Sequence, residues 1–262
     1  MSEECTHDCS SCASDCAGST QNNAAPLHAD ATVRHVYAVC GGKGGVGRTT
    51  VAALLAASVQ KKYLQAAVLD ADLTGPGIPA AFGLTGRVMP DTFGMFPVET
   101  QSGIQTMSVN SIIPNPTDPV LAKGTLVDNT LKKFWSTTVW EEVDMMLVDM
   151  PAGTGEVPLA VMRTLPLEGV IVVTEPGKAA AVITEKTLKM ARALKLPVIG
   201  MVINRADTPA LSCEPAKALA EAYGVTLTVS LPCDPQLAAF MDDGEIEMYN
   251  TTRLDPLLDR MF

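Results

Sequence analysis

The feature that most constrains the fold is a set of short runs that are apolar at every position. One such run, residues 170–173, reads Val-Ile-Val-Val. A strand with one face in water alternates apolar and polar side chains, so a continuous apolar run requires that both faces be covered. Stretches rich in Ala, Leu and Lys, which favour helices, separate the runs. The pattern predicts a doubly wound α/β fold, a mostly parallel sheet with helices on both faces.

We expect about seven strands and one domain from residue 33 to residue 262. The predicted strands are residues 33–40, 66–70, 104–109, 145–149, 170–174, 198–203 and 226–231. The predicted helices are residues 49–62, 126–136, 157–164, 179–194 and 214–223. Ligands of such sheets bind beyond the carboxyl ends of the strands, so residues at those ends are the first candidates for a site.

A glycine-rich loop follows the first predicted strand. Five glycines fall within residues 41–47, and the stretch from Gly42 to Thr49 fits the phosphate-loop pattern Gly-x4-Gly-x-Thr. Glycines let successive N–H groups turn toward a phosphate, and the positive end of the following helix adds to the attraction. The Thr49 hydroxyl is placed to bind Mg2+. The sequence therefore predicts that the loop binds the phosphates of a nucleotide with Mg2+, through Gly42, Lys43, Gly44, Gly45, Val46, Gly47, Arg48, Thr49 and Thr50.

One position departs from the phosphate-loop pattern. Arg48 stands where a lysine usually contacts the β- and γ-phosphates. A guanidinium keeps the charge but is wider and planar, so the exchange is not conservative in a tight cradle. We expect nucleotide binding to persist and hydrolysis to be slower.

Four of the seven cysteines lie close together near the N-terminus, at Cys5, Cys9, Cys12 and Cys16. Their spacing, Cys-x3-Cys-x2-Cys-x3-Cys, lets four thiolates converge on one Fe–S cluster or one Zn2+. The alternative is a disordered tail that is prone to oxidation. Residues 17–32 are polar and without apolar periodicity, which predicts a flexible linker, so residues 1–32 form a cysteine-rich tail and linker.

Charge and hydropathy exclude several classes of protein. The formal net charge is −10, from 29 acidic and 19 basic residues, which argues against a nucleic-acid partner. No apolar stretch approaches the ~18–20 residues of a membrane-spanning helix, and no signal peptide is evident. The expectation is a cytoplasmic protein without a membrane or nucleic-acid partner.

Several motifs together resemble one family and cover nearly the whole chain. The loop, the stretch of residues 70–79 (Asp-Ala-Asp-Leu-Thr-Gly-Pro-Gly-Ile-Pro) and the stretch of residues 147–156 (Leu-Val-Asp-Met-Pro-Ala-Gly-Thr-Gly-Glu) are similar to the Mrp/ApbC family. Members of that family are P-loop ATPases, related to MinD and nitrogenase iron protein, that carry Fe–S clusters. The resemblance implies a nucleotide-dependent dimer in which Lys43 reaches the partner's nucleotide, and it implies recipient Fe–S apoproteins.

The resemblance also implies roles for residues at the strand ends. Asp72 would position the attacking water, Asp70 would lie near Mg2+, and Asp149 would contact Mg2+-bound water. For the first two, a helix cap or turn is the alternative. Asn204 and Arg205 match the place where relatives bind adenine, with a plain strand-end turn as the alternative.

Some positions differ from the family pattern. Members usually carry a Cys-x2-Cys pair that shares a [4Fe–4S] cluster between two subunits, and here only Cys213 remains in that region. Cys233 could add a thiolate, but we expect it to be buried as a small apolar residue. These differences, with Arg48, leave two hypotheses. The chain is either an ATP-dependent carrier with its cluster on the N-terminal cysteines, or a catalytically weak regulatory subunit in a heterodimer with a full Mrp-type ATPase.

Overall fold

The computed structural model describes residues 25–88, 92–120 and 125–262, which build one eight-stranded sheet in the order β3-β4-β2-β5-β1-β6-β7-β8. All neighbouring strands are parallel except β3 and β4. The strands are β1 (Val33–Cys40), β2 (Ala66–Asp70), β3 (Val98–Glu99), β4 (Gln105–Met107), β5 (Val143–Asp149), β6 (Gly169–Thr174), β7 (Val198–Ile203) and β8 (Thr228–Ser230). The doubly wound α/β fold is confirmed.

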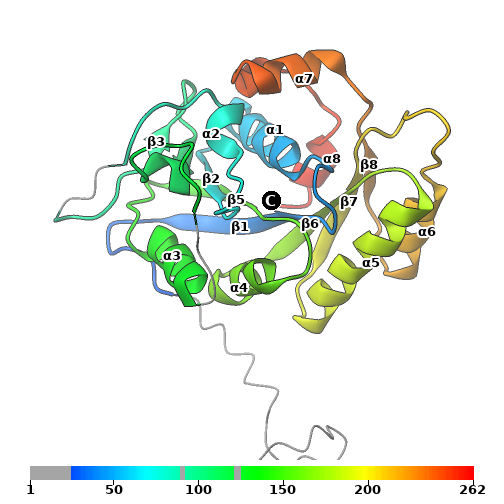
Figure 1. Ribbon diagram of the computed structural model, residues 1–262, viewed down its shortest axis with the longest axis horizontal. Coiled ribbons are helices and arrows are strands. Elements are labelled where there is room, and N and C mark those ends of the chain that lie inside the picture. The colour runs from blue at the N-terminus through cyan, green and yellow to red at the C-terminus, as the bar shows by residue number, and fades with distance from the viewer. Residues whose placement is uncertain (1–24, 89–91, 121–124) are drawn as a thin grey trace, which may run out of the picture.

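Helices cover both faces of the sheet (Figure 1). On one face lie α1 (Arg48–Lys61), α2 (Ile78–Ala81), α7 (Pro235–Asp242), the 3-10 turn η2 (Ile246–Met248) and α8 (Asp255–Leu258). On the other lie α3 (Thr125–Ser136), α4 (Glu156–Thr164), α5 (Lys178–Ala193) and α6 (Glu214–Ala222). A further 3-10 turn, η1, spans Val109–Ser111. Each face has its own apolar core, and this explains why β2 and β6 are buried at every residue.

All seven predicted strands are present, and three of them have the predicted bounds. The eighth, β3, is two residues long and pairs antiparallel with β4, too short to leave a pattern in the sequence. The sequence also did not indicate α2, α7 and α8, which have four, eight and four residues. Helices this short show little periodicity, and each carries a proline near its start, which suggests a turn as readily as a helix.

The central strand β1 positions the glycine-rich loop. It pairs with β5 on one side and β6 on the other, so the loop leaves the sheet between the ends of those two strands. Helix α1, which follows the loop, is apolar and buried from Val51 through Ala57. A helix enclosed in this way cannot shift without opening the core, so the loop is anchored at both ends.

The described part of the predicted linker contacts the body of the protein. Ala25 and Leu27 pack against the core, and Trp135 Nε1 donates a hydrogen bond to the Ala25 carbonyl at 2.7 Å. Parts of residues 25–32 therefore contact the folded body, although Pro26, Ala29, Asp30 and Thr32 are exposed. The four clustered cysteines, residues 5–16, lie outside the described residues. Among the described residues, no helix combines the length and the apolar character that crossing a bilayer requires.

Candidate functional site

The loop between β1 and α1 has the backbone of an anion cradle. Gly45 and Gly47 have φ values of 75° and 95°, in the left-handed region that glycine adopts without strain. A Cβ on Gly47 would collide with the side-chain amide of Asn204, and a Cβ on Gly42 would lie 2.6 Å from the Ile183 carbonyl. These two glycines are therefore required by the fold itself. No atom lies within 4 Å of the Cβ position of Gly44 or Gly45, so the outer side of the loop is open.

Thr49 and Asp149 form a polar pair at the base of the loop. The Thr49 hydroxyl donates a hydrogen bond to Asp149 Oδ2 at 2.6 Å. Asp149 is 1 % exposed, and its second oxygen, Oδ1, has no hydrogen-bond partner. Burial raises the pKa of this carboxyl to about 7, against the lowering effects of the Thr49 hydrogen bond and the Arg48 charge. A buried carboxylate oxygen without a partner beside a hydroxyl is what a divalent cation or its bound water would satisfy. Thr49 and Asp149 thus fit Mg2+.

Asp70 lies beside Asp149, since the two residues are register partners at the ends of β2 and β5. Both oxygens of Asp70 are engaged, Oδ1 by the N–H of Asp72 and Oδ2 by the N–H of Ile78 and the hydroxyl of Ser108, each at 3.2 Å. Burial, followed by the neighbouring Asp149 charge, raises its pKa well above the ordinary value. Asp70 therefore organises the start of α2, and Ser108 is a partner that the sequence did not indicate.

Asp72 is half-buried in the turn that follows β2. Its Oδ1 accepts hydrogen bonds from the Thr74 hydroxyl and the Gly75 N–H, both at 3.0 Å. This contact corresponds to the alternative role of Asp72, a residue that stabilises a turn. The other carboxylate oxygen is not used in that turn, so the contact and a role toward water are compatible.

Three cations of the loop region are bound within the chain. Arg48 donates from Nε to the Met150 carbonyl and from Nη1 to the Lys43 carbonyl, both at 2.8 Å. Lys43 forms an ion pair with Glu175, the residue directly after β6. Arg205 donates to the Gly45 carbonyl. Glu175 was not singled out from the sequence, although its place after a predicted strand end was a usable signal.

A pocket of about 440 Å3 flanks the loop on its α7 side. Gly47 and Thr50 form one wall, and the Asn204 amide, which donates to the Val46 carbonyl at 2.9 Å, forms another. The structure thus brings Asn204 and Arg205 to the glycine-rich loop. The remaining walls come from the β8–α7 connection and α7, a contribution that the sequence did not reveal: Pro232, Cys233, Asp234, Leu237, Ala238, Met241 and Asp242.

Cys213 and Cys233 both contact the turn after β7 and form no disulfide. Cys213 precedes α6 and donates weakly to the Ala206 carbonyl, with 3.3 Å between sulfur and oxygen. Cys233 is exposed, which corrects the expectation of burial: it sits in the β8–α7 connection, where its N–H donates to Asp207 at 2.6 Å. No group of three or more His, Cys, Asp or Glu side chains suited to a metal ion occurs within residues 25–88, 92–120 and 125–262.

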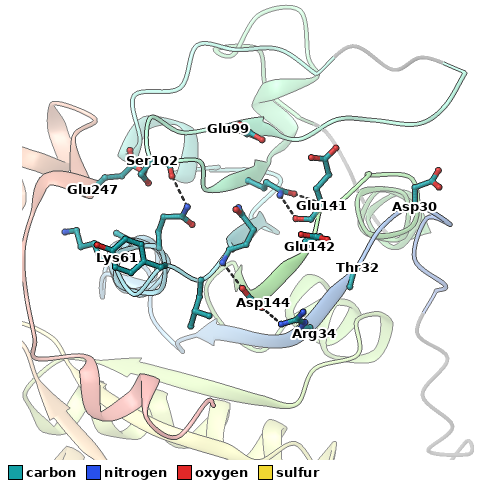
Figure 2. A pocket seen from close by; sticks show the side chains of 16 residues that line it. Asp30, Thr32, Arg34, Lys61, Glu99, Ser102, Glu141, Glu142, Asp144 and Glu247 are labelled. Carbon is teal, nitrogen blue, oxygen red and sulfur yellow. Dashed lines mark hydrogen bonds and ion pairs between the residues drawn. The ribbon is translucent and has the colours of Figure 1, made fainter.

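A larger cavity, about 1200 Å3, opens at the amino ends of the strands, away from the glycine-rich loop. Figure 2 shows Glu99, Glu141, Glu142 and Glu247 around it, with Lys61 among the basic residues. None of the predicted site residues lines this cavity. Its acidic lining is unsuited to phosphates, so the glycine-rich loop remains the candidate nucleotide site.

Comparison with known proteins gives the same family as the motifs. The chain is 34 % identical over 236 residues to an iron-sulfur cluster carrier protein of Clostridium perfringens, covering 83 % of this chain and 82 % of that one. It is 33 % identical over 222 residues to an iron-sulfur cluster carrier protein of Methanococcus maripaludis, covering 82 % and 77 %.

Solved structures agree. A nucleotide-binding protein from Archaeoglobus fulgidus in complex with ADP superposes with a TM-score of 0.74 at 33 % identity, covering 85 % of this chain and 91 % of that one. The cell division ATPase MinD of Pyrococcus furiosus shares the fold, with a TM-score of 0.62 at 19 % identity and coverage of 87 % and 96 %. The model of the ParA-type family described as NUBPL iron-transfer P-loop NTPase matches residues 32–258, and the chain belongs to that family.

Proposed function

We propose that the chain is an ATP-dependent iron–sulfur cluster carrier of the cytoplasm. Mg2+·ATP occupies the loop Gly42–Thr49, with adenine in the pocket formed by Asn204, Arg205 and the start of α7. Binding favours a dimer, and the cluster passes to recipient apoproteins. The proposal extends to this chain what the names of its relatives say of them.

One observation carries the nucleotide part of this proposal. Asp149 Oδ1 is buried without a partner, next to a hydroxyl at the base of a loop whose outer side is open. Leaving a carboxylate oxygen in this state costs free energy, and Mg2+ bound to a nucleotide would remove that cost. When bound, Mg2+ would neutralise charge on the phosphates. The chain itself supplies Thr49 and Asp149 to hold the ion, and Asp72 to orient a water.

The cargo part rests on the N-terminal cysteines. Among the described residues no group of three or more His, Cys, Asp or Glu side chains is suited to a metal ion, so Cys5, Cys9, Cys12 and Cys16 are the candidate ligands, for a [4Fe–4S] cluster or for Zn2+. Anaerobic reconstitution of the full chain with iron and sulfide tests this. We expect a sulfur-to-iron absorption band in the wild type and in a Cys213→Ser/Cys233→Ser control. The band should be lost in the quadruple Cys→Ser variant of the tail; equal iron uptake by that variant would exclude the tail as the cluster site.

A second function, the regulatory subunit, is favoured by the contacts of Arg48. Its guanidinium donates to two main-chain carbonyls, those of Met150 and Lys43, and this engagement supports slow hydrolysis. The turnover of ATP by the wild type and by Arg48→Lys separates the two functions. A low wild-type rate that rises in Arg48→Lys supports the regulatory subunit. A high wild-type rate that does not rise supports the carrier.

A further inference from the structure

Glu175 is a carboxylate placed beside the phosphate loop, where an anion would be expected to weaken phosphate binding. It follows β6, the neighbour of β1, so it stands at the same edge of the sheet as the loop. Its side chain is 18 % exposed, and it is ion-paired with Lys43 and lies 3.8 Å from Arg205 Nη1. Lys43 and Arg205 are two of the three cations among the predicted ligands of the nucleotide, the third being Arg48.

Both cations are ion-paired with the Glu175 carboxylate and remain partly exposed. Lys43 and Arg205 keep 49 % and 43 % of their side-chain surface exposed, so solvent and solutes can reach them. The third cation, Arg48, is bound to main-chain carbonyls and has no ion pair with Glu175. Within the described part of the chain, Glu175 is the acidic residue whose ion pairs engage loop cations.

We propose that Glu175 is a positioning residue that holds Lys43 and Arg205 on the loop of their own chain and competes with nucleotide phosphates for them. This inference rests on the proposed nucleotide site and adds a regulation to it. In the empty state the carboxylate neutralises the cations. Nucleotide entry exchanges that carboxylate for phosphate oxygens, and Lys43 becomes free to leave its own loop.

The size of the effect follows from exposure. Partly exposed ion pairs are weak, and each changes an equilibrium constant by at most about fivefold. Neutralising Glu175 should therefore tighten Mg2+·ATP binding by about threefold to tenfold. The gain should shrink at high salt, because screening weakens the interactions of exposed charges.

Two variants of equal charge provide the test. Glu175→Gln removes the carboxylate beside the loop, and Glu214→Gln removes one from an exposed pair with Lys217 at the start of α6. Calorimetric titration with Mg2+·ATP should give a lower Kd for Glu175→Gln at low salt and an unchanged Kd for Glu214→Gln. In a double-mutant cycle, Lys43→Gln should weaken binding more in the Glu175→Gln background than in the wild type. An unchanged Kd for Glu175→Gln, or additive effects in the cycle, overturns the competition.

A measurement without nucleotide separates this inference from the nucleotide site itself. The rate at which an amine-reactive acylating reagent modifies Lys43, read by peptide mass spectrometry, should rise in Glu175→Gln and stay at the wild-type value in Glu214→Gln. If no variant binds nucleotide while acylation of Lys43 rises, the nucleotide site is wrong and the ion pair is real. If acylation does not rise, Glu175 does not hold Lys43.

Discussion

The buried carboxyl of Asp149 makes a quantitative prediction about the nucleotide-free protein. Its pKa is about 7 in the folded chain and about 3.8 when solvated, so the folded state binds a proton more tightly than the unfolded state. A carboxyl whose pKa is higher in the folded state than in the unfolded state contributes stability that is fully present below pH 4, and this contribution is lost as the pH rises through 7. A difference of about 3 units corresponds to about 4 kcal/mol. By the same relation, about 3 kcal/mol of this loss falls between pH 5 and pH 8.

Asp149→Asn removes this titration and keeps the shape of the side chain. We expect the variant to exceed the wild type in the free energy of unfolding at pH 8, and the difference to shrink by about 3 kcal/mol at pH 5. Urea denaturation at both pH values, without nucleotide or Mg2+, measures it. Asp259→Asn, at an exposed aspartate after α8, controls for loss of a surface charge. A difference between Asp149→Asn and wild type that does not change with pH would refute the argument from burial.

Three further predictions concern the loop and the core. Gly47→Ala places a Cβ on a residue with a φ of 95° and against the Asn204 side chain, so we expect the free energy of unfolding to fall by about 1–3 kcal/mol and ATP binding to be lost in calorimetry. Gly44→Ala is the control, because its Cβ meets open space and its stability should be unchanged. Equal losses of stability in both variants would contradict the geometry. Thr187→Val replaces a buried hydroxyl that has no hydrogen-bond partner, so the free energy of unfolding in urea denaturation should rise by about 1 kcal/mol. A decrease would show that the hydroxyl makes a hydrogen bond. Mg2+·ADP at about 100 times its Kd should stabilise the wild type by about 2.7 kcal/mol, measured as a rise in Tm, and Mg2+·ADP without effect on Tm would argue against the site.

Much of the fold could be predicted from local sequence patterns. Continuous apolar runs identified the central strands because both faces of those strands are buried, and the loop was identified because its glycines have a steric role. The elements that were missed, β3, α2, α7 and α8, are short, and their stability comes from packing against distant parts of the chain. Contacts between distant parts of the chain cannot be predicted from local hydrophobic periodicity.

The residues of the glycine-rich loop could be predicted from the sequence, but most of the residues that surround the loop could not. The hydrogen bond between Thr49 and Asp149 joins residues 100 positions apart. The sequence did not predict this contact, although the loop pattern and the family resemblance placed both residues near Mg2+. The partners Ser108 and Glu175 depend on side-chain directions at strand ends, which a single sequence does not specify. The β8–α7 wall of the pocket depends on how α7 packs, and Cys233 was misjudged for the same reason.

We expect a nucleotide to bind with its phosphates in the loop between β1 and α1 and with its base beside Asn204. A crystal structure of the full chain with Mg2+·ADP tests this most directly. We expect phosphate oxygens within hydrogen-bond distance of the N–H groups of residues 44–49, Mg2+ near Thr49 and Asp149, and adenine in the pocket of about 440 Å3. Electron density for ADP in the acidic cavity, or an empty loop at saturating ADP, would contradict it.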